Sequence, residues 1–462
     1  MHDDDREGAA SPEGPGSAAD SDFPGARTLW YLTFLALVAG ILTGFVGGAF
    51  RKLLVETEAL RTDLVEWAHG HGPWGPLVPV AVSALAAGLA TWIGHRWKMS
   101  GGSGIQHVEA VERDQDVPAP ASTVPARFVG GLLSIGVAGM VLGREGPTVH
   151  MGATLGALVA RIGRATRDEI RVLQTCLSGA GLAVAFNAPI GGAIFVFEEV
   201  AHKVRIRYVI WTLVAVAAAV TCSRVVLGDH PDFRVLALAE PAVATLPLFA
   251  VFGLCLGLLA VGYNYAVTRT LARVTAVRVV PPFGTGAAIG AVIGLGLVYV
   301  PEAVGGGDAL AQSMLDGREV AFWMLALYLA LRFCAGPLSY AAGSPGGLFA
   351  PMLALGTLGG VFFARLAELS GVPIDADTRV TLMIAGMAGL FAASVRAPFT
   401  GIVLVMEMCA ITTVSISMVV TAAFAVIVAS ALRSPPVYDS LREQMLDAER
   451  RTGRRADGTP LE

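Results

Sequence analysis

Long apolar stretches interrupted by glycine, proline or asparagine dominate this sequence. Residues 333–364 contain no charged side chain, and Gly343-Ser344-Pro345-Gly346-Gly347 interrupts them. Residues 172–197 are also uncharged and are broken at Asn187-Ala188-Pro189. Non-helical backbone survives at membrane depth only where protein buries it or where it lines a watery cavity. The pattern therefore predicts an all-α polytopic membrane protein with broken helices around an internal site.

Composition agrees with a membrane protein. Charged residues make up 15% of the 462 residues, whereas soluble domains carry roughly 25%. A membrane-crossing helix needs roughly 20 apolar residues, and several stretches here are shorter than that or broken. The expected helical spans are 28–50, 76–94, 128–143, 172–197 as two helices, 208–223, 241–268, 279–300, 333–364 as two helices, 380–395, 398–406 and 408–432.

The ends of the chain differ from the apolar centre. Residues 1–27 are acidic, rich in small residues and without an apolar core, which predicts a disordered tail and not a signal peptide. The membrane domain is expected over 28–445, followed by a tail over 446–462. Basic residues cluster at 96–98, 161–171, 203–207 and after residue 433. The positive-inside rule places these loops and both termini in the cytoplasm.

Two sets of motifs recur in the same order in the two halves of the chain. Pro189 and Pro398 are each followed by glycine at +3 and by glutamate at +9, namely Glu198 and Glu407. Pro147 and Pro351 are each followed by glycine at +5 and +9. The repeats are expected over about 28–230 and 240–432. A duplication with interrupted helices at matching positions indicates a transport site between the halves.

The segment Gly143-Arg144-Glu145-Gly146-Pro147 places two charges at the head of an apolar helix expected over 148–160. Ionisable groups inside a membrane are rare and usually functional, so Glu145 is the first candidate site residue. A surface loop with both charges in water is the alternative, and the repeat argues against it. The sequence identifies no partner for Arg144.

Three further carboxylates lie near apolar helices. Glu198 and Glu199 end one such helix, and the alternative to a functional role is a membrane-surface helix end. In that alternative Arg205 or Arg207 is the partner. Glu407 holds the place of Glu198 in the second repeat, and we interpret it as a structural buried carboxylate. Its expected partner is Arg396 or Arg332.

Four segments have the character of helix N-termini or loops that converge on one site. They are residues 101–105, 143–147 and 346–351, and Tyr438 after two prolines. Glycines let backbone N–H groups approach a ligand, and a helix N-terminus offers unpaired donors with partial positive charge. Ser103 and Tyr438 add hydroxyl donors. Each segment alone is a common cap or turn, but together they predict a site for a small anion.

Four motifs of this chain resemble those of the CLC family of chloride channels and chloride/proton exchangers. In chain order they are Gly-Ser-Gly-Ile, Gly-Arg-Glu-Gly-Pro, Gly-Gly-Leu-Phe-Ala-Pro and the late Tyr438. The resemblance covers residues from about 28 to 445. It implies a CLC-type inverted repeat of short, tilted and broken helices. It also implies a homodimer in a lipid bilayer, with chloride and protons as the transported species and a separate anion pathway in each subunit.

The resemblance further implies roles for individual residues. Glu145 is expected to be the gating glutamate, which occupies the outer anion position when ionised and releases it when protonated. Glu199 is expected to be the inner proton acceptor, with Glu198 in a supporting place beside it. The central anion is expected on the Ser103 and Tyr438 hydroxyls and the Leu348 and Phe349 amides. The backbone of the outer site is expected at Arg144, Gly146 and Ala350.

One residue departs from the family pattern, and two others bear on the activity. The family commonly has proline after Gly-Ser-Gly-Ile, where this chain has Gln106. Ser103 goes with a preference for chloride over nitrate. Channels of the family tend to lose the inner acidic residue, whereas this chain keeps Glu199, so the resemblance favours exchange over passive conduction by a chloride channel. A fluoride/proton antiporter is a lesser alternative, which the presence of both Ser103 and Tyr438 disfavours.

Other classes of function find little support in the sequence. The five cysteines show no CxxC spacing and the eight histidines no HxxxH or HExxH pattern, so neither a metal site nor a cofactor is expected. The net charge of −4 argues against a nucleic-acid partner. An intramembrane enzyme using Glu145 with Glu199 or His150 would lack a nucleophile motif. The expectation is a prokaryotic transporter of the inner membrane.

Overall fold

The computed structural model describes residues 25–97, 99–235, 238–277, 279–453, 455 and 459–460, in which the regular structure is helical throughout. The helices of the first repeat are α1 (Ala26–His69), α2 (Leu77–Arg96), α3 (Ile105–Glu112), α4 (Thr123–Gly131), α5 (Glu145–Ile162), α6 (Arg167–Phe186), α7 (Pro189–Phe195) and α8 (Ile206–Leu227). Those of the second are α9 (Leu246–Ala276), α10 (Pro282–Tyr299), α11 (Asp308–Leu315), α12 (Phe322–Ala341), α13 (Phe349–Leu369), α14 (Ala376–Val395), α15 (Pro398–Cys409) and α16 (Ser415–Ala431). Helix α17 (Val437–Thr452) follows.

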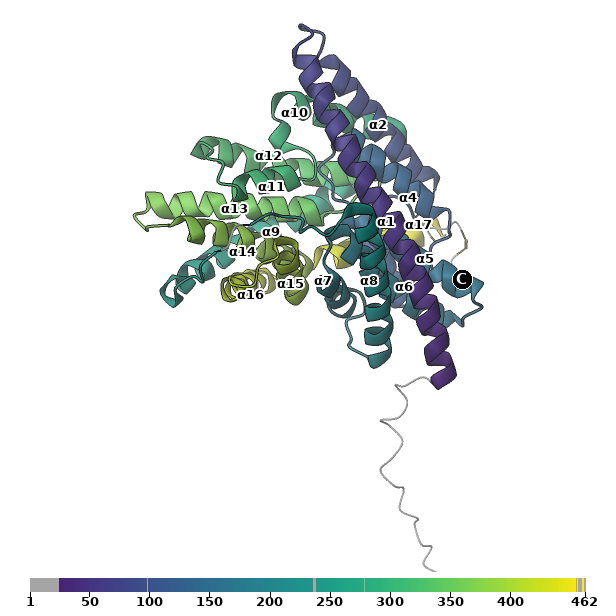
Figure 1. The fold of residues 1–462 in the computed structure, drawn as a ribbon. Coiled ribbons are helices and arrows are strands. Elements are labelled where there is room, and N and C mark those ends of the chain that lie inside the picture. The colour runs from purple at the N-terminus through teal and green to yellow at the C-terminus, as the bar shows by residue number, and fades with distance from the viewer. Residues whose placement is uncertain are drawn as a thin grey trace, which may run out of the picture.

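The same helix pairings occur in both halves. Helix α1 packs on α8 and α5 on α6, and correspondingly α9 packs on α16 and α13 on α14. Two further pairs, α2 with α10 and α7 with α15, join helices from opposite halves. Figure 1 shows α12, α13 and α16 on one side of the molecule and α1, α5 and α6 on the other. The expected fold class, a polytopic all-α protein of two related halves, is confirmed.

The predicted helix breaks lie where the sequence placed them. Asn187 ends α6 in the left-handed conformation, with φ of 50°, and Pro189 then begins α7. The glycine-rich stretch 343–347 separates α12 from α13. Among the described residues, eight helices are long and apolar enough to cross a membrane. The protein is therefore a multi-pass membrane protein.

Several boundaries differ from the prediction. The stretch 128–143 is not one helix: α4 ends at Gly131 and continues as a π-helical turn over Leu132–Val137, and Gly139, at φ of 64°, closes the segment. The span predicted over 408–432 begins only at Ser415, because Ala410 ends α15 at φ of 51°. Helix α17 continues past residue 445. Of the predicted tail, residues 1–24 lie outside the described residues.

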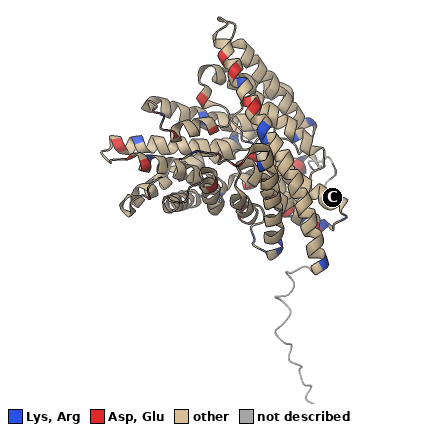
Figure 2. Cartoon of the chain, viewed as in Figure 1, with Lys and Arg blue, Asp and Glu red and all other residues tan. Residues whose placement is uncertain are grey.

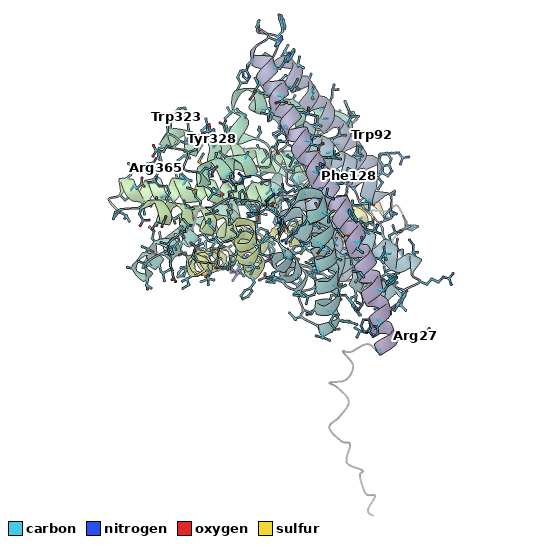
Figure 3. The ribbon with its side chains drawn as sticks, viewed as in Figure 1. Arg27, Trp92, Phe128, Trp323, Tyr328 and Arg365 are labelled. Carbon is cyan, nitrogen blue, oxygen red and sulfur yellow. The ribbon has the colours of Figure 1, made fainter. Side chains whose placement is uncertain are left out.

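The outer surface is apolar over most of the helices. Trp92 on α2 and Trp323 on α12 are 46% and 65% exposed and project outward (Figure 3), as aromatic residues do at membrane interfaces. Figure 2 shows few charged positions along most helices, whereas the half of α1 beyond residue 50 carries several. That half of α1 lies past the apolar stretch 28–50, so only the first half has the composition of a bilayer span.

Candidate functional site

The two repeats meet at two glycines. Gly143 and Gly347 exchange backbone hydrogen bonds, with N···O distances of 2.9 and 2.8 Å. They are equivalent residues, because each precedes the first residue of its helix (α5 or α13) by two positions. The N-termini of α5 and α13 are thereby brought face to face, and partial positive charge from both gathers in one place.

Glu145 lies between these two helix ends. It is the first residue of α5, is fully buried, and its Oε1 accepts the N–H of Phe349 at 2.6 Å. Its Oε2 is buried without a hydrogen-bond partner among the described residues. A Cβ on Gly143 or Gly347 would fall 2.1 or 2.3 Å from the carboxylate oxygens, so a side chain at either position would displace this carboxylate. The carboxylate therefore accepts a donor at a helix N-terminus, as a bound anion would.

Two hydroxyl groups next to this carboxylate are buried and unpartnered. Ser103 Oγ and Tyr438 OH each lack a hydrogen-bond partner among the described groups, although both residues are fully buried. A Cβ on Gly146 would fall 2.7 Å from Ser103 Oγ, so the first turn of α5 lies directly on this serine. Buried polar groups are almost always satisfied. Two orphan hydroxyls in one place indicate a site for a ligand that accepts hydrogen bonds.

The first turn of α13 completes the predicted site. Leu348, the residue before α13, and the helical residues Phe349 and Ala350 are all buried. The Phe349 ring lies 5.6 Å from that of Tyr438, measured between centroids. It also contacts three further aromatic rings, those of Phe186, Phe195 and Phe391. These rings fix the residue whose amide holds Glu145. The structure thus brings together all four predicted anion-site residues.

A buried arginine shapes the Ser103 loop. Arg127 on α4 donates to four backbone carbonyls at 2.9 to 3.0 Å, those of Met99, Gly101, Gly102 and Ser103. Gly104 adopts φ of 86°, which favours glycine, and α3 begins after it. The second repeat has the same arrangement. Arg332 donates to the carbonyls of Glu302, Val304, Gly305 and Gly306, and Gly307 precedes α11 with φ of 102°.

Gln106 replaces the expected proline without disturbing this loop. Its Oε1 accepts the N–H of Gly104 at 3.1 Å, and its Nε2 lies 3.5 Å from the hydroxyl of Tyr340. The same hydroxyl accepts the N–H of Ser103 at 3.4 Å. The side chain of Gln106 thus accepts a backbone N–H at the start of α3, whereas proline at this position would remove one backbone donor and so the need for its acceptor.

The structure supplies the missing partner of Arg144. Its guanidinium donates to Asp232 Oδ2 at 2.8 Å and to the carbonyl of Ala185 at 2.9 Å, and lies 3.4 Å from Asp308. Asp232 also accepts from Arg51 at 2.5 Å. These four charged side chains border a cavity of about 250 Å³. Arg144 therefore directs its charge away from the loop that carries Glu145, toward this cavity.

The inner carboxylates have separate environments. Glu199 is buried in the π-helical turn Val196–Val200 that extends α7. It adjoins the buried carboxyl group of Glu109 on α3, a residue that sequence reasoning missed. Arg442 on α17 contacts Glu109 Oε2 at 3.2 Å. Two adjacent buried carboxyl groups repel each other when both are ionised, so they are suited to hold a proton between them.

Glu198 and Glu407 make reciprocal contacts across the two repeats. Glu198 accepts the N–H groups of Phe399 and Thr400 at the start of α15, at 3.1 and 2.6 Å, and the Thr400 hydroxyl at 2.7 Å. Glu407 accepts the N–H groups of Ile190 and Gly191 at the start of α7, at 3.0 and 2.7 Å.

The ion pairs expected for Glu407 are therefore wrong. Arg332 binds backbone carbonyls, as described above, and Arg396 donates to Ser430 and to the Ser434 carbonyl. The cause is geometric, because Glu407 lies at the N-terminus of the partner helix α7, where unpaired N–H groups are available. The predicted equivalence of Glu407 and Glu198 in the two repeats agrees with their reciprocal contacts.

Within the described residues, no three His, Cys, Asp or Glu side chains are grouped as a metal site requires. The chemistry at hand consists of helix N-termini, hydroxyls and carboxylates. Such groups bind small anions and protons.

The chain resembles known transporters over most of its length. Residues 84–430 match the family described as voltage gated chloride channel. The H(+)/Cl(-) exchange transporter ClcA of Vibrio cholerae is 35% identical over 437 residues, covering 91% of each chain. ClcA of Salmonella agona is 36% identical, covering 92% of this chain and 91% of that one.

Solved structures show the same architecture. A slow cyanobacterial Cl-/H+ antiporter superposes with a TM-score of 0.84 at 29% identity, covering 91% of this chain and 99% of that one. A CLC-type fluoride/proton antiporter superposes with a TM-score of 0.72 at 20% identity, covering 90% and 99%. At that lower identity the second likeness concerns the fold.

Proposed function

Because the chain belongs to the voltage-gated chloride channel (CLC) family, we propose that it exchanges chloride for protons across the membrane. Members with about 35% identity over nine tenths of the chain carry the name H(+)/Cl(-) exchange transporter. The observation that carries the proposal is the buried Glu145 carboxylate on the Phe349 amide, beside the unpartnered hydroxyls of Ser103 and Tyr438.

In the proposed mechanism Glu145 competes with chloride for the same donors. When ionised, its carboxylate occupies the outer anion position, whose backbone comes from Arg144, Gly146 and Ala350. When a proton neutralises it, the attraction to the two helix N-termini falls and an anion takes its place. One side chain therefore links proton binding to anion movement, and no metal or cofactor is needed.

The central anion is proposed to lie between the hydroxyls of Ser103 and Tyr438 and the amides of Leu348 and Phe349. Both hydroxyls can donate, because neither has another partner among the described groups. Arg127 is fully buried and faces carbonyl oxygens. The anion thus meets partial charges and hydroxyls in place of a fixed cation, which permits its release.

Protons are proposed to enter from the cytoplasm through Glu199. Glu199 and its neighbour Glu109 form a buried pair that holds one proton. This pair passes the proton on to Glu145. Glu198 has a supporting role beside Glu199, since α15 binds both of its oxygens. We further propose a homodimer with one pathway in each subunit, located in the inner membrane with both termini in the cytoplasm. Transport is its whole activity, and no enzymatic reaction is assigned to it.

Reconstituted proteoliposomes test the proposal. A proton gradient is expected to drive chloride movement against its own gradient, and the reversal potential is expected to depend on both gradients. Chloride flux with a reversal potential independent of pH would instead identify a passive channel. Fluoride transport that excludes chloride would identify a fluoride/proton antiporter. Light-scattering mass in detergent tests the homodimer separately.

A further inference from the structure

The gate segment, residues 143–147, carries a cation next to the proposed gate Glu145. Arg144 shares one acceptor, Asp232, with Arg51 of α1. One carboxylate between two guanidinium groups leaves one positive charge unbalanced. Asp308, the first residue of α11, lies 3.4 Å from Arg144 and provides a second carboxylate. The four charged side chains around the cavity of about 250 Å³ therefore balance only when Asp308 is included.

The two carboxylates differ in their contact with water. The side chain of Asp232 is 6% exposed, whereas that of Asp308 is 44% exposed. The loop before Asp308 is the one that Arg332 braces through four carbonyls. A Cβ on Gly306 in this loop would fall 3.6 Å from the carbonyl oxygen of Leu142, so the loop lies against the start of the gate segment. Asp308 is thus held beside the gate segment at the edge of the cavity.

This cavity lies at the end of α5 that the proposed orientation places outside the cell. Arg144 precedes α5, and Arg161 is in its last turn, 18 residues further on. A helix of that length spans about 27 Å. Arg161 belongs to the basic cluster 161–171, which the positive-inside rule places in the cytoplasm. External water and protons therefore meet Asp308 before they meet Glu145.

Arg144 and Asp308 act on Glu145 with opposite signs. The positive charge of Arg144 favours the ionised carboxylate, and the negative charge of Asp308 favours its protonated form. Because Asp308 is partly exposed and faces Arg144, its own carboxylate stays ionised near neutral pH. His230 borders the same cavity. The other charged or titratable groups that face Glu145 or Asp308 are Tyr263 of α9, Tyr438 of α17, Asp232 after α8, Glu58 of α1 and Arg332 of α12.

We propose that Asp308 sets the external pH at which Glu145 opens the anion path, because its charge cancels the field of Arg144 at the gate. Asp308 is then a positioning residue, which acts on the gate through its charge and does not contact the anion. The inference rests on the proposed function, since Glu145 is the gate in both. A unit charge about 10 Å away, at an effective dielectric constant of about 40, changes a protonation equilibrium about fourfold. Loss of Asp308 should therefore lower the opening pH by about 0.6 of a unit.

Chloride flux from proteoliposomes, measured against external pH at a fixed internal pH, tests this in the full chain. Glu199→Gln and His230→Gln together form the background, because they remove the inner proton acceptor and the histidine of the cavity. In this background chloride flux is expected to rise with external acid as Glu145 takes up a proton. Asp308→Asn should move the midpoint to lower pH by about 0.6 of a unit, and Asp308→Glu should restore it.

Asp316→Asn is the matched control. It removes the same charge from the other end of the same helix, at an exposed residue that accepts from Gln312, and should leave the midpoint unchanged. If Asp308→Asn does not fold, the charge can be changed after folding through Asp308→Cys and charged methanethiosulfonate reagents. A negative reagent should return the midpoint toward its original value, and a positive one should lower it further. The protein without Asp308→Cys should respond to neither reagent.

The outcomes separate the two proposals. Absence of chloride flux in every variant at all pH values would reject the proposed function. Chloride flux that keeps its dependence on external pH after Glu145→Ala would reject Glu145 as the gate. A midpoint that is the same with aspartate and with asparagine at position 308 would overturn the role of Asp308 alone. Equal shifts in Asp308→Asn and Asp316→Asn, or equal shifts with the two reagents, would overturn it as well.

Discussion

The carboxylate of Glu145, the first residue of α5, accepts the N–H of Phe349, the first residue of α13, at 2.6 Å. The two residues occupy equivalent positions in the two repeats, so one repeat supplies the tethered anion and the other the donor. In the proposed mechanism this contact is the gate, because an entering anion takes the place of the carboxylate at that amide.

Glu145→Ala is expected to abolish proton coupling while chloride flux persists, because it removes the titratable group that accepts this amide. Paired chloride and pH electrodes on proteoliposomes measure both fluxes. Glu240→Ala, at an exposed glutamate before α9, is the control and should retain full coupling. Coupling that survives in Glu145→Ala would show that the gating role has been misassigned.

Ser103→Ala and Tyr438→Phe are each expected to weaken chloride binding at least about tenfold, since a hydrogen bond to a charged group contributes about 1.5–3 kcal/mol. Calorimetry measures the affinity. In crystals soaked with bromide, anomalous density should lie between the two hydroxyls and disappear in the double variant. Tyr265→Phe, at a tyrosine that is 64% exposed, should bind chloride normally. Bromide density elsewhere only would reject the assignment.

Asp232→Asn is expected to lower the free energy of unfolding by about 2–3 kcal/mol. The aspartate is the shared acceptor of Arg51 and Arg144, and its loss leaves two partly buried cations facing each other. Denaturant unfolding in detergent gives the value. Asp229→Asn breaks an exposed pair with Arg224 and should cost less than about 1 kcal/mol. Equal losses in the two variants would mean that the Asp232 bridge does not stabilise the protein.

Glu407→Ala is expected to reduce stability by about 1 kcal/mol, the usual cost of losing an N-terminal helix cap, and to leave the ratio of proton to chloride flux unchanged. Its carboxylate binds the start of α7 and takes no part in the anion site. Glu198→Ala removes the corresponding cap on α15 and should lower the free energy of unfolding by at least as much. An altered flux ratio in Glu407→Ala would contradict a purely structural role.

The sequence predicted the parts of the site that depend on local motifs. Glycines beside Glu145, the proline-headed helices and the hydroxyls of Ser103 and Tyr438 all carry a signature within a few residues. The equivalence of Pro147 with Pro351 also paired the helix that carries Glu145 with the helix that carries Phe349, although it did not predict the contact between these two residues. The helix breaks at Asn187 and at 343–347 were also predicted correctly, because they too carry a signature within a few residues.

Contacts between distant segments were not accessible in the same way. Asp232 follows α8 in an irregular segment, and nothing near it in sequence indicates that it meets Arg144. Glu109 is one acidic residue on a short helix, and only the fold brings it to Glu199. The π-helical end of α4 was missed because hydropathy reports apolar length and not hydrogen-bond pattern. Glu407 was given cationic partners because the sequence cannot show that a facing helix offers free N–H groups.

Arg127 and Arg332 brace two loops of the same shape, yet only one loop carries a serine; the residue at the matching place is Gly306. The arginine thus braces the loop in both repeats and does not by itself distinguish one loop from the other. What distinguishes the first loop is the single hydroxyl of Ser103. The second loop is followed instead by Asp308, whose carboxylate lies 3.4 Å from Arg144.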